Sequence, residues 1–89
     1  MKTIDTFELT PQLDNARSFY RKAFALHMSD GSIQLKSYDT IVATFKDDKV
    51  NVNGTYSMTT LRHIKEFIYQ LTGVSGLTKK DIEKDYQAN

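Results

Sequence analysis

Cysteine is absent from this chain, proline occurs once in its 89 residues, and no long apolar run is present. Without cysteine the chain has no disulfide, no thiolate metal ligand and no cysteine nucleophile, which is typical of proteins from a reducing compartment. The first residues contain no apolar signal-peptide core, and no segment approaches the length needed to cross a membrane. We therefore expect a soluble cytoplasmic protein that does not contact membranes.

An excess of one charge is also lacking, because twelve lysines and arginines stand against eleven aspartates and glutamates. Nonspecific nucleic-acid binders carry a marked basic excess, since phosphate contacts dominate their affinity. A protein that mimics DNA would instead be strongly acidic. The balance disfavours both classes, although it is compatible with a local patch. The length predicts a single domain with a small core.

Glycine-rich loops and clustered metal ligands are missing as well. The four glycines are isolated from one another, so they form no loop that could cradle a phosphate. His63 and Glu66 stand three residues apart on an expected helix, but a metal site would also need His27 from across the sheet. We therefore expect no metal site and no cofactor.

The clearest pattern that is present lies in residues 56–73, where apolar side chains recur at the spacing of an amphipathic helix. These side chains are Leu61, Ile64, Phe67, Ile68 and Leu71. The hydroxyls of Ser57, Thr59 and Thr60 can cap the start, and Gly73 can take the left-handed conformation that ends many helices. The pattern predicts one main helix over about residues 58–72.

The segments before this helix alternate apolar and polar residues over short runs, which favours strands. Residues 17–28 fit a strand or a helix, and we choose a strand because the turn at residues 29–32 needs one on each side. Residues 33–37, 40–46 and 50–52 continue the alternation, with Ile41, Ala43 and Phe45 on one side. The sum is an α+β fold, an antiparallel sheet of three to four strands packed against one helix.

Both ends of the chain leave alternatives open. Ile4, Phe7 and Leu9 suit a short edge strand, which Pro11 would interrupt, but a short helix before Asn15 fits equally well. After residue 73, Thr78 and Asp81 resemble a capping box, and Ile82 and Tyr86 share a helix face. We expect a single domain over residues 1–73 with an N-terminal arm, followed at residues 74–89 by a hinge and a short C-terminal helix or tail.

Catalysis would have to involve His63, near the start of the helix. No serine, cysteine or acid stands at a spacing that completes a nucleophile and base, so we favour a structural histidine bonded to the backbone of the sheet or to solvent. Arg62 and Glu66 fit a helix-surface ion pair. The chain is therefore predicted not to be an enzyme.

A cationic strip is the best candidate for a binding site. Basic and aromatic side chains interleave over residues 17–22, a mixture used for stacking on bases and in protein interfaces, and two helix residues could join it. The predicted partner-binding residues are Arg17, Phe19, Tyr20, Arg21, Lys22, Arg62 and Lys65. The plainer alternative is a solvated face.

Aromatic residues are plentiful, with five tyrosines and five phenylalanines. Phe24, Phe45 and Phe67 are expected in the core. The domain is too small to bury every tyrosine, so part of the set formed by Tyr20, Tyr38, Tyr56 and Tyr69 should be exposed. Exposed aromatic surface suggests a partner.

Three segments, SFYRKA (residues 18–23), LKSYDTIVA (35–43) and YSMTTLRHIKEF (56–67), resemble a family of small uncharacterised proteins. Its members are encoded by phages, plasmids and conjugative elements, largely of Firmicutes, with the motifs SFYGKA, SYxTxVA and YSxTTxRHIxEFL. Arg21 replaces the usual glycine, and Ile68 stands where leucine is common. In the third motif, the segment from Thr59 to His63 is expected to cap the helix and bond it to the sheet.

The resemblance implies a genomic setting and not a reaction. Small accessory proteins of mobile elements are often counter-defence factors, including anti-CRISPR proteins. We therefore expect a non-enzymatic inhibitor of a host CRISPR–Cas nuclease, Cas9 or another effector, that acts by protein–protein binding in the bacterial cytoplasm as a monomer or small homo-oligomer. The alternative is a small DNA- or RNA-binding regulator of a phage or conjugative element.

Overall fold

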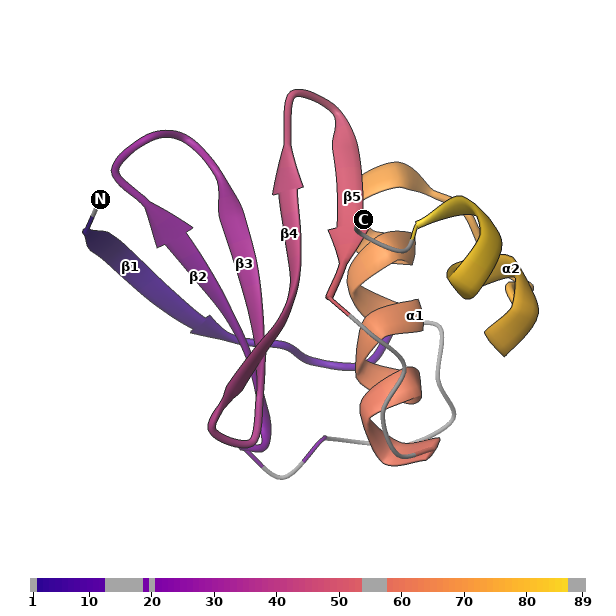
Figure 1. Ribbon diagram of the computed structural model, residues 1–89. Helices are drawn as coiled ribbons and strands as arrows, with labels where there is room; N and C mark the ends of the chain where they lie inside the picture. Colours follow the sequence, from indigo (N-terminus) through magenta and orange to yellow (C-terminus); the bar gives the residue numbers. More distant parts are fainter. Residues whose placement is uncertain (1, 13–18, 20, 54–57, 87–89) are drawn as a thin grey trace.

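The computed structural model describes residues 2–12, 19, 21–53 and 58–86. Five strands precede two helices along this part of the chain (Figure 1). The strands are β1 (Thr3–Glu8), β2 (Ala23–Met28), β3 (Ile33–Ser37), β4 (Thr40–Lys46) and β5 (Lys49–Val52), and the helices are α1 (Met58–Thr72) and α2 (Lys79–Asp85). The predicted α+β class and the predicted main helix are confirmed.

The sheet is an antiparallel meander in which the strand order follows the sequence from β1 to β5. It contains five strands, so the predicted number of three to four was too low. The first segment supplies the extra strand, because β1 pairs with β2 and this pairing continues to Leu9, whose N–H donates to the carbonyl of Ala23 at 2.8 Å. Pro11 lies beyond this last bond and does not interrupt the ladder. The other alternative for this segment was a short helix before Asn15. Residues 13–15, where that helix would end, lie outside the described part of the chain.

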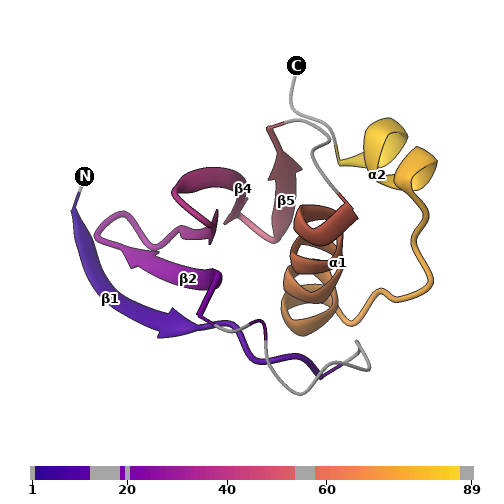
Figure 2. The same cartoon turned by 90° about the horizontal axis from the view of Figure 1, so that it is seen from below.

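Helix α1 lies across one face of the sheet, where it contacts β3 and β4 (Figure 2). Its apolar stripe meets the inward side chains of the sheet, as an amphipathic helix requires. The core cluster includes Leu35, Ala43, Ile64, Phe67 and Ile68. Strands β1 and β2 extend past the helix, so α1 covers only part of the face on which it lies.

Two side chains lie on a different face from the one that alternation predicted. Phe24 points away from α1, because the inward positions of β2 are those of Ala23, Ala25 and His27. Phe24 is half-buried, so its assignment to the core was wrong. On β4 the register shifts, and Ile41 pairs with Lys36 on the face turned away from α1. Such a bulge inserts one residue and reverses the alternation that follows.

The C-terminal segment forms a helix, as one of the two alternatives predicted. Helix α2 begins at the predicted capping box, in which the N–H of Asp81 donates to the hydroxyl of Thr78 at 3.2 Å and the N–H of Thr78 donates to the Asp81 carboxylate at 2.9 Å. Ile82 is buried in the same core as α1, and the carbonyl of Tyr86 accepts from the N–H of Val52 at 2.6 Å. Neither helix in the described ranges has the length and apolar character that a membrane crossing needs.

Candidate functional site

A polar cluster joins α1 to the sheet at the start of the helix. The hydroxyl of Ser37 at the end of β3 lies 2.8 Å from Nδ1 of His63 and 3.2 Å from the hydroxyl of Thr60. All three residues are buried in the interface between helix and sheet. This is the helix-to-sheet bond expected for the third motif, and its partner in the sheet is the Ser37 side chain.

The short distance between Ser37 and His63 resembles that of a nucleophile and its base. Their surroundings do not suit catalysis, because Ser37 is 2% exposed and His63 is 1% exposed. The ring of Phe19 packs edge-on against the His63 ring at 4.6 Å between centroids, and the Tyr38 ring lies tilted to it at 6.0 Å. Both groups are therefore covered in this arrangement, and their hydrogen bonds tie α1 to the sheet.

Phe19 is the first predicted binding residue that the structure places differently. It is 5% exposed and belongs to the core, so its ring is not available to a partner. The reason is the histidine ring beside it, which offers an apolar face to pack against. Arg17 and Tyr20, on either side of it in the sequence, lie outside the described residues.

Arg21 and Lys22 are exposed at the turn that leads into β2. Arg21 has a φ of 63°, and its N–H donates to the Glu8 carboxylate at 3.1 Å. A positive φ favours glycine, which is the residue that the resembled motif carries at this position. The ammonium group of Lys22 lies 5.5 Å from the centre of the Tyr38 ring, and that ring is 45% exposed. The expected exposed tyrosine is therefore confirmed at Tyr38.

The two helix residues of the predicted strip differ in exposure. Arg62 is exposed on α1, whereas Lys65 is half-buried.

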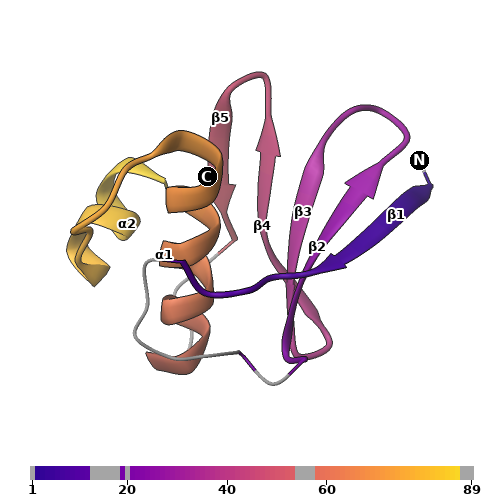
Figure 3. The same ribbon diagram turned by 180° about the vertical axis from the view of Figure 1, so that it is seen from behind.

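The predicted surface pair of Arg62 with Glu66 is wrong in one respect, because Glu66 is buried and its carboxylate accepts from the side chain of Gln70 at 2.8 Å. The same amide nitrogen of Gln70 donates to the carbonyl of Thr10 at 2.7 Å, which fastens the segment after β1 to the helix (Figure 3).

Strand β1 is the most exposed element of the sheet. Every one of its six residues is exposed, and two of them are large and apolar. Ile4 is 70% exposed and Phe7 is 50% exposed. Because β1 is the first strand in the sheet order, one of its edges has no neighbouring strand in the described structure. Open edges and exposed apolar side chains are both features that favour association with another chain.

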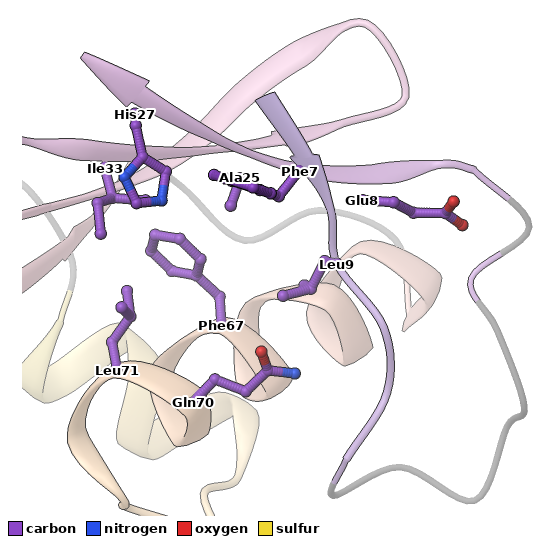
Figure 4. A pocket seen from close by; sticks show the side chains of 9 residues that line it. All are labelled: Phe7, Glu8, Leu9, Ala25, His27, Ile33, Phe67, Gln70 and Leu71. Carbon is purple, nitrogen blue, oxygen red and sulfur yellow. The ribbon is translucent and has the colours of Figure 1, made fainter. Parts of the chain in front are cut away.

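A pocket of ≈ 220 Å³ lies between β1 and β2 on one side and the C-terminal half of α1 on the other (Figure 4). Its walls are mainly apolar, with Phe7 and Ala25 above and Phe67 and Leu71 below. Ile33 of β3 also lines it, beside His27. The pocket exists because α1 packs on β3 and β4, so the first two strands project beyond the helix.

Polar groups stand at the margins of the pocket. The ring of His27 lines one wall and packs edge-on against Phe7, with 5.1 Å between the ring centroids. The amide of Gln70 lies at the opposite margin, and the carboxylate of Glu8 points away from the pocket (Figure 4). A small number of polar groups around an apolar hollow is typical of a binding pocket.

The sequence did not predict this pocket. The structure also separates the two histidines, which the sequence analysis had considered together. His63 lies in the polar cluster, and His27 lies in the pocket beside Phe7. No group of three potential metal-binding side chains occurs among the residues that the structure describes. The only sequence signal near the pocket was the predicted short edge strand with Ile4, Phe7 and Leu9, of which Phe7 and Leu9 line the pocket.

The comparisons with known proteins identify a family but no activity. A family model described as "Family of unknown function (DUF8033)" matches residues 7–84. The chain belongs to this family. No curated protein matches the chain, and no solved structure does. The match begins at Phe7, so the residues that line the pocket and those of the polar cluster lie within it, whereas residues 3–6 of β1 precede it.

Proposed function

We propose that the chain is a non-enzymatic binding protein of a mobile element that inhibits a host CRISPR–Cas nuclease, Cas9 or another effector, by protein–protein contact. The exposed strand β1 carries the proposal, because it combines an open edge with two large apolar side chains in water. A folded protein that keeps such a strand uncovered has surface available for a partner.

The placement of the reactive groups supports a binding role over a catalytic one. Ser37 and His63, which are close enough to act together, are buried under Phe19 and hold α1 on the sheet. The pocket beneath β1 is lined mainly by apolar side chains. The near-neutral charge supports recognition by shape in place of the strongly acidic surface that DNA mimicry requires.

The test is a DNA cleavage assay with guide-loaded Cas9 from a Gram-positive host, to which increasing amounts of the purified protein are added. The proposal predicts protection of the target DNA in proportion to the protein added, with no binding to the DNA alone. The variant Ile4→Lys should protect less, because a charge replaces an exposed apolar contact. The matched substitution Val74→Lys, at an exposed position between α1 and α2, should protect the DNA as the parent does.

Unimpeded cleavage by Cas9 and by the other effector nucleases of such hosts would contradict the proposal. Equal loss of protection in the two lysine variants would contradict the assignment of the contact to β1. Each variant should be checked by thermal unfolding, so that a loss of folding is not taken for a loss of binding.

A second function, a small DNA- or RNA-binding regulator, is favoured by one observation. The ammonium group of Lys22 lies over the exposed ring of Tyr38, and Arg21 is exposed beside it. Cations beside exposed aromatic rings are used to stack bases and hold phosphates. This function predicts binding to nucleic acid at low salt that weakens steeply as salt is added. Absence of binding at low salt would exclude it.

A further inference from the structure

We infer that β1 and the pocket beneath it form a groove for an extended, positively charged segment of a partner protein. The segment pairs with the open edge of β1 and places one apolar side chain in the pocket. This inference rests on the proposed function, which it makes more specific, and it names the kind of surface that the target must offer.

The backbone of β1 has hydrogen-bonding groups available at its open edge. Leu9 donates to Ala23 of β2, and in an antiparallel pair such bonded positions alternate along the strand. The N–H groups of Thr6 and Glu8 therefore point away from β2. Addition of a strand to such an edge is a common way in which proteins bind extended peptides.

One of these edge groups has a local partner in the free protein. The N–H of Thr6 donates to the carboxylate of its neighbour Asp5 at 2.9 Å, and both residues are exposed. An exposed hydrogen bond of this kind contributes little net free energy, since water can replace either partner. An incoming carbonyl can take its place, and the released Asp5 carboxylate can then pair with a cation on the incoming segment.

The pocket has the size and chemistry for one apolar side chain. An apolar cavity of about 150 Å³ is known to hold a benzene ring, so ≈ 220 Å³ accommodates a leucine, methionine or phenylalanine side chain. The pocket is lined by Phe7 of β1, so an anchor within it lies next to the strand that the segment pairs with. Its lower wall, Phe67 and Leu71, belongs to α1 and is held by the core.

Charge identifies the occupant as a basic segment. The only ionisable side chains within β1 are those of Asp5 and Glu8, and both are acidic and exposed. Helix α1 carries no basic residue in its last turn, so the negative end of its dipole at Leu71 also favours a cation. A second copy of β1 fits less well, because pairing the strand with itself would bring acidic side chains together. Acidic groups along the edge also disfavour nucleic acid.

The experiment selects binders from a phage-displayed library of linear random peptides, with the full-length protein as bait. We expect enriched peptides to alternate, to carry several lysines or arginines, and to share one large apolar residue. Synthetic versions should bind the variant Ala25→Leu about tenfold or more weakly, because the added side chain fills the pocket. The control is Gln34→Leu, which places a leucine on the opposite face of the sheet and should bind the peptides like the parent.

Edge pairing is tested separately by Thr6→Pro, which removes the outward N–H without altering the pocket wall. Proline is tolerated at such edge positions, and thermal unfolding verifies that the variant folds. We expect binding of the peptides to be lost or weakened about tenfold. Failure to enrich any peptide overturns the inference, as does enrichment of acidic peptides or equal binding to Ala25→Leu and to the parent.

The outcome for the groove can be separated from the outcome for the proposed function. Protection of DNA in the cleavage assay without enriched peptides would overturn the groove and leave the inhibitor function in place. A different result would be basic peptides that bind Ala25→Leu more weakly than the parent, together with no protection of DNA in the cleavage assay. That result would support the groove and reject the nuclease as its target.

Discussion

The two halves of the sheet differ in how they are covered. Strands β3, β4 and β5 form the covered half, in which α1 packs on an apolar core and the polar cluster joins helix to sheet. Strands β1 and β2 form the overhang, which projects beyond the helix and shelters the pocket. Among the strand residues, the exposed large apolar side chains, Ile4 and Phe7, are therefore in the overhang, at the other end of the sheet from most of the buried core.

This separation shows how a chain of 89 residues can keep exposed apolar side chains and still fold. A domain of this size has little free energy of unfolding to lose, roughly 5 kcal/mol or more. Stability is concentrated where α1 meets the sheet. Strand β1 adds exposed residues to the edge, so changes there should affect binding more than stability.

The largest expected effect compares two aliphatic truncations, one in each half. Leu35→Ala removes a fully buried side chain from the covered half and should lower the free energy of unfolding by about 2–5 kcal/mol. Ile4→Ala in the overhang should change it by less than about 0.5 kcal/mol, because most of that side chain is already in water. Urea unfolding of both variants measures the difference. Similar losses would remove the distinction between the halves.

The two histidines give the next comparison. His63→Ala takes a buried ring from the polar cluster and leaves Ser37 without its 2.8 Å partner, so we expect a loss of about 2–4 kcal/mol. His27→Ala removes a half-buried ring from the pocket wall and should cost about 1 kcal/mol or less. Thermal and urea unfolding distinguish the two. A larger loss for His27 would mean that the pocket belongs to the stabilising core.

A smaller effect is expected at the start of α2. Thr78→Ala removes the capping hydroxyl and should lower the free energy of unfolding by about 1 kcal/mol. Ser75→Ala, at an exposed position before the helix, is the control and should be neutral. Because Ile82 anchors α2 in the covered half, the loss should appear in global unfolding. A neutral Thr78→Ala variant would show that α2 is not coupled to the core.

The smallest effect concerns an exposed link between the halves. Asp30, in the turn after β2, accepts from the hydroxyl of Ser32 at 2.6 Å and from Lys46 of β4 at 3.2 Å. The hydroxyl and N–H of Ser32, and then Lys46, lower the pKa of Asp30 from 3.8 to about 2. A pKa lower in the folded state than in the unfolded chain stabilises the fold above about pH 3.8. This stabilisation is lost as the pH falls toward 2.

The pH dependence is measured with Asp30→Asn. In urea unfolding at a series of pH values, stability should fall less steeply below about pH 3.8 in this variant than in the parent. The control Asp39→Asn, in the turn between β3 and β4, leaves these hydrogen bonds intact. An unchanged slope in the Asp30 variant would mean that other carboxylates account for the acid sensitivity.

The parts of the fold that could be predicted were those set by local sequence. The helical spacing of Leu61, Ile64 and Phe67 predicted α1, and Thr78 with Asp81 predicted the start of α2. Local chemistry is sufficient there, because apolar periodicity and capping act within one or two turns. The expected bond between His63 and the sheet is also present, but it goes to the side chain of Ser37 and not to the backbone or to solvent.

The pocket and the faces of the strands depended on long-range pairing. The bulge that turns Ile41 away from α1 comes from the register between β3 and β4, for which the sequence contains no local signal. Phe19 was predicted to be a contact and is buried, because the ring it packs against lies more than 40 residues later in the chain. The pocket likewise depends on long-range arrangement. It forms only because β1 pairs with β2 while α1 packs mainly on β3 and β4.

Hydrogen exchange of single amides tests the division of the molecule most directly. The amide of Phe7 in β1 and the amide of Leu35 in β3 lie at inward positions of an edge strand and of a central strand. We predict that Leu35 exchanges only through global unfolding, whereas Phe7 exchanges through local opening of the overhang at a free energy well below the global value. Equal free energies of opening at the two amides would contradict the account, because β1 would then belong to the stabilising core.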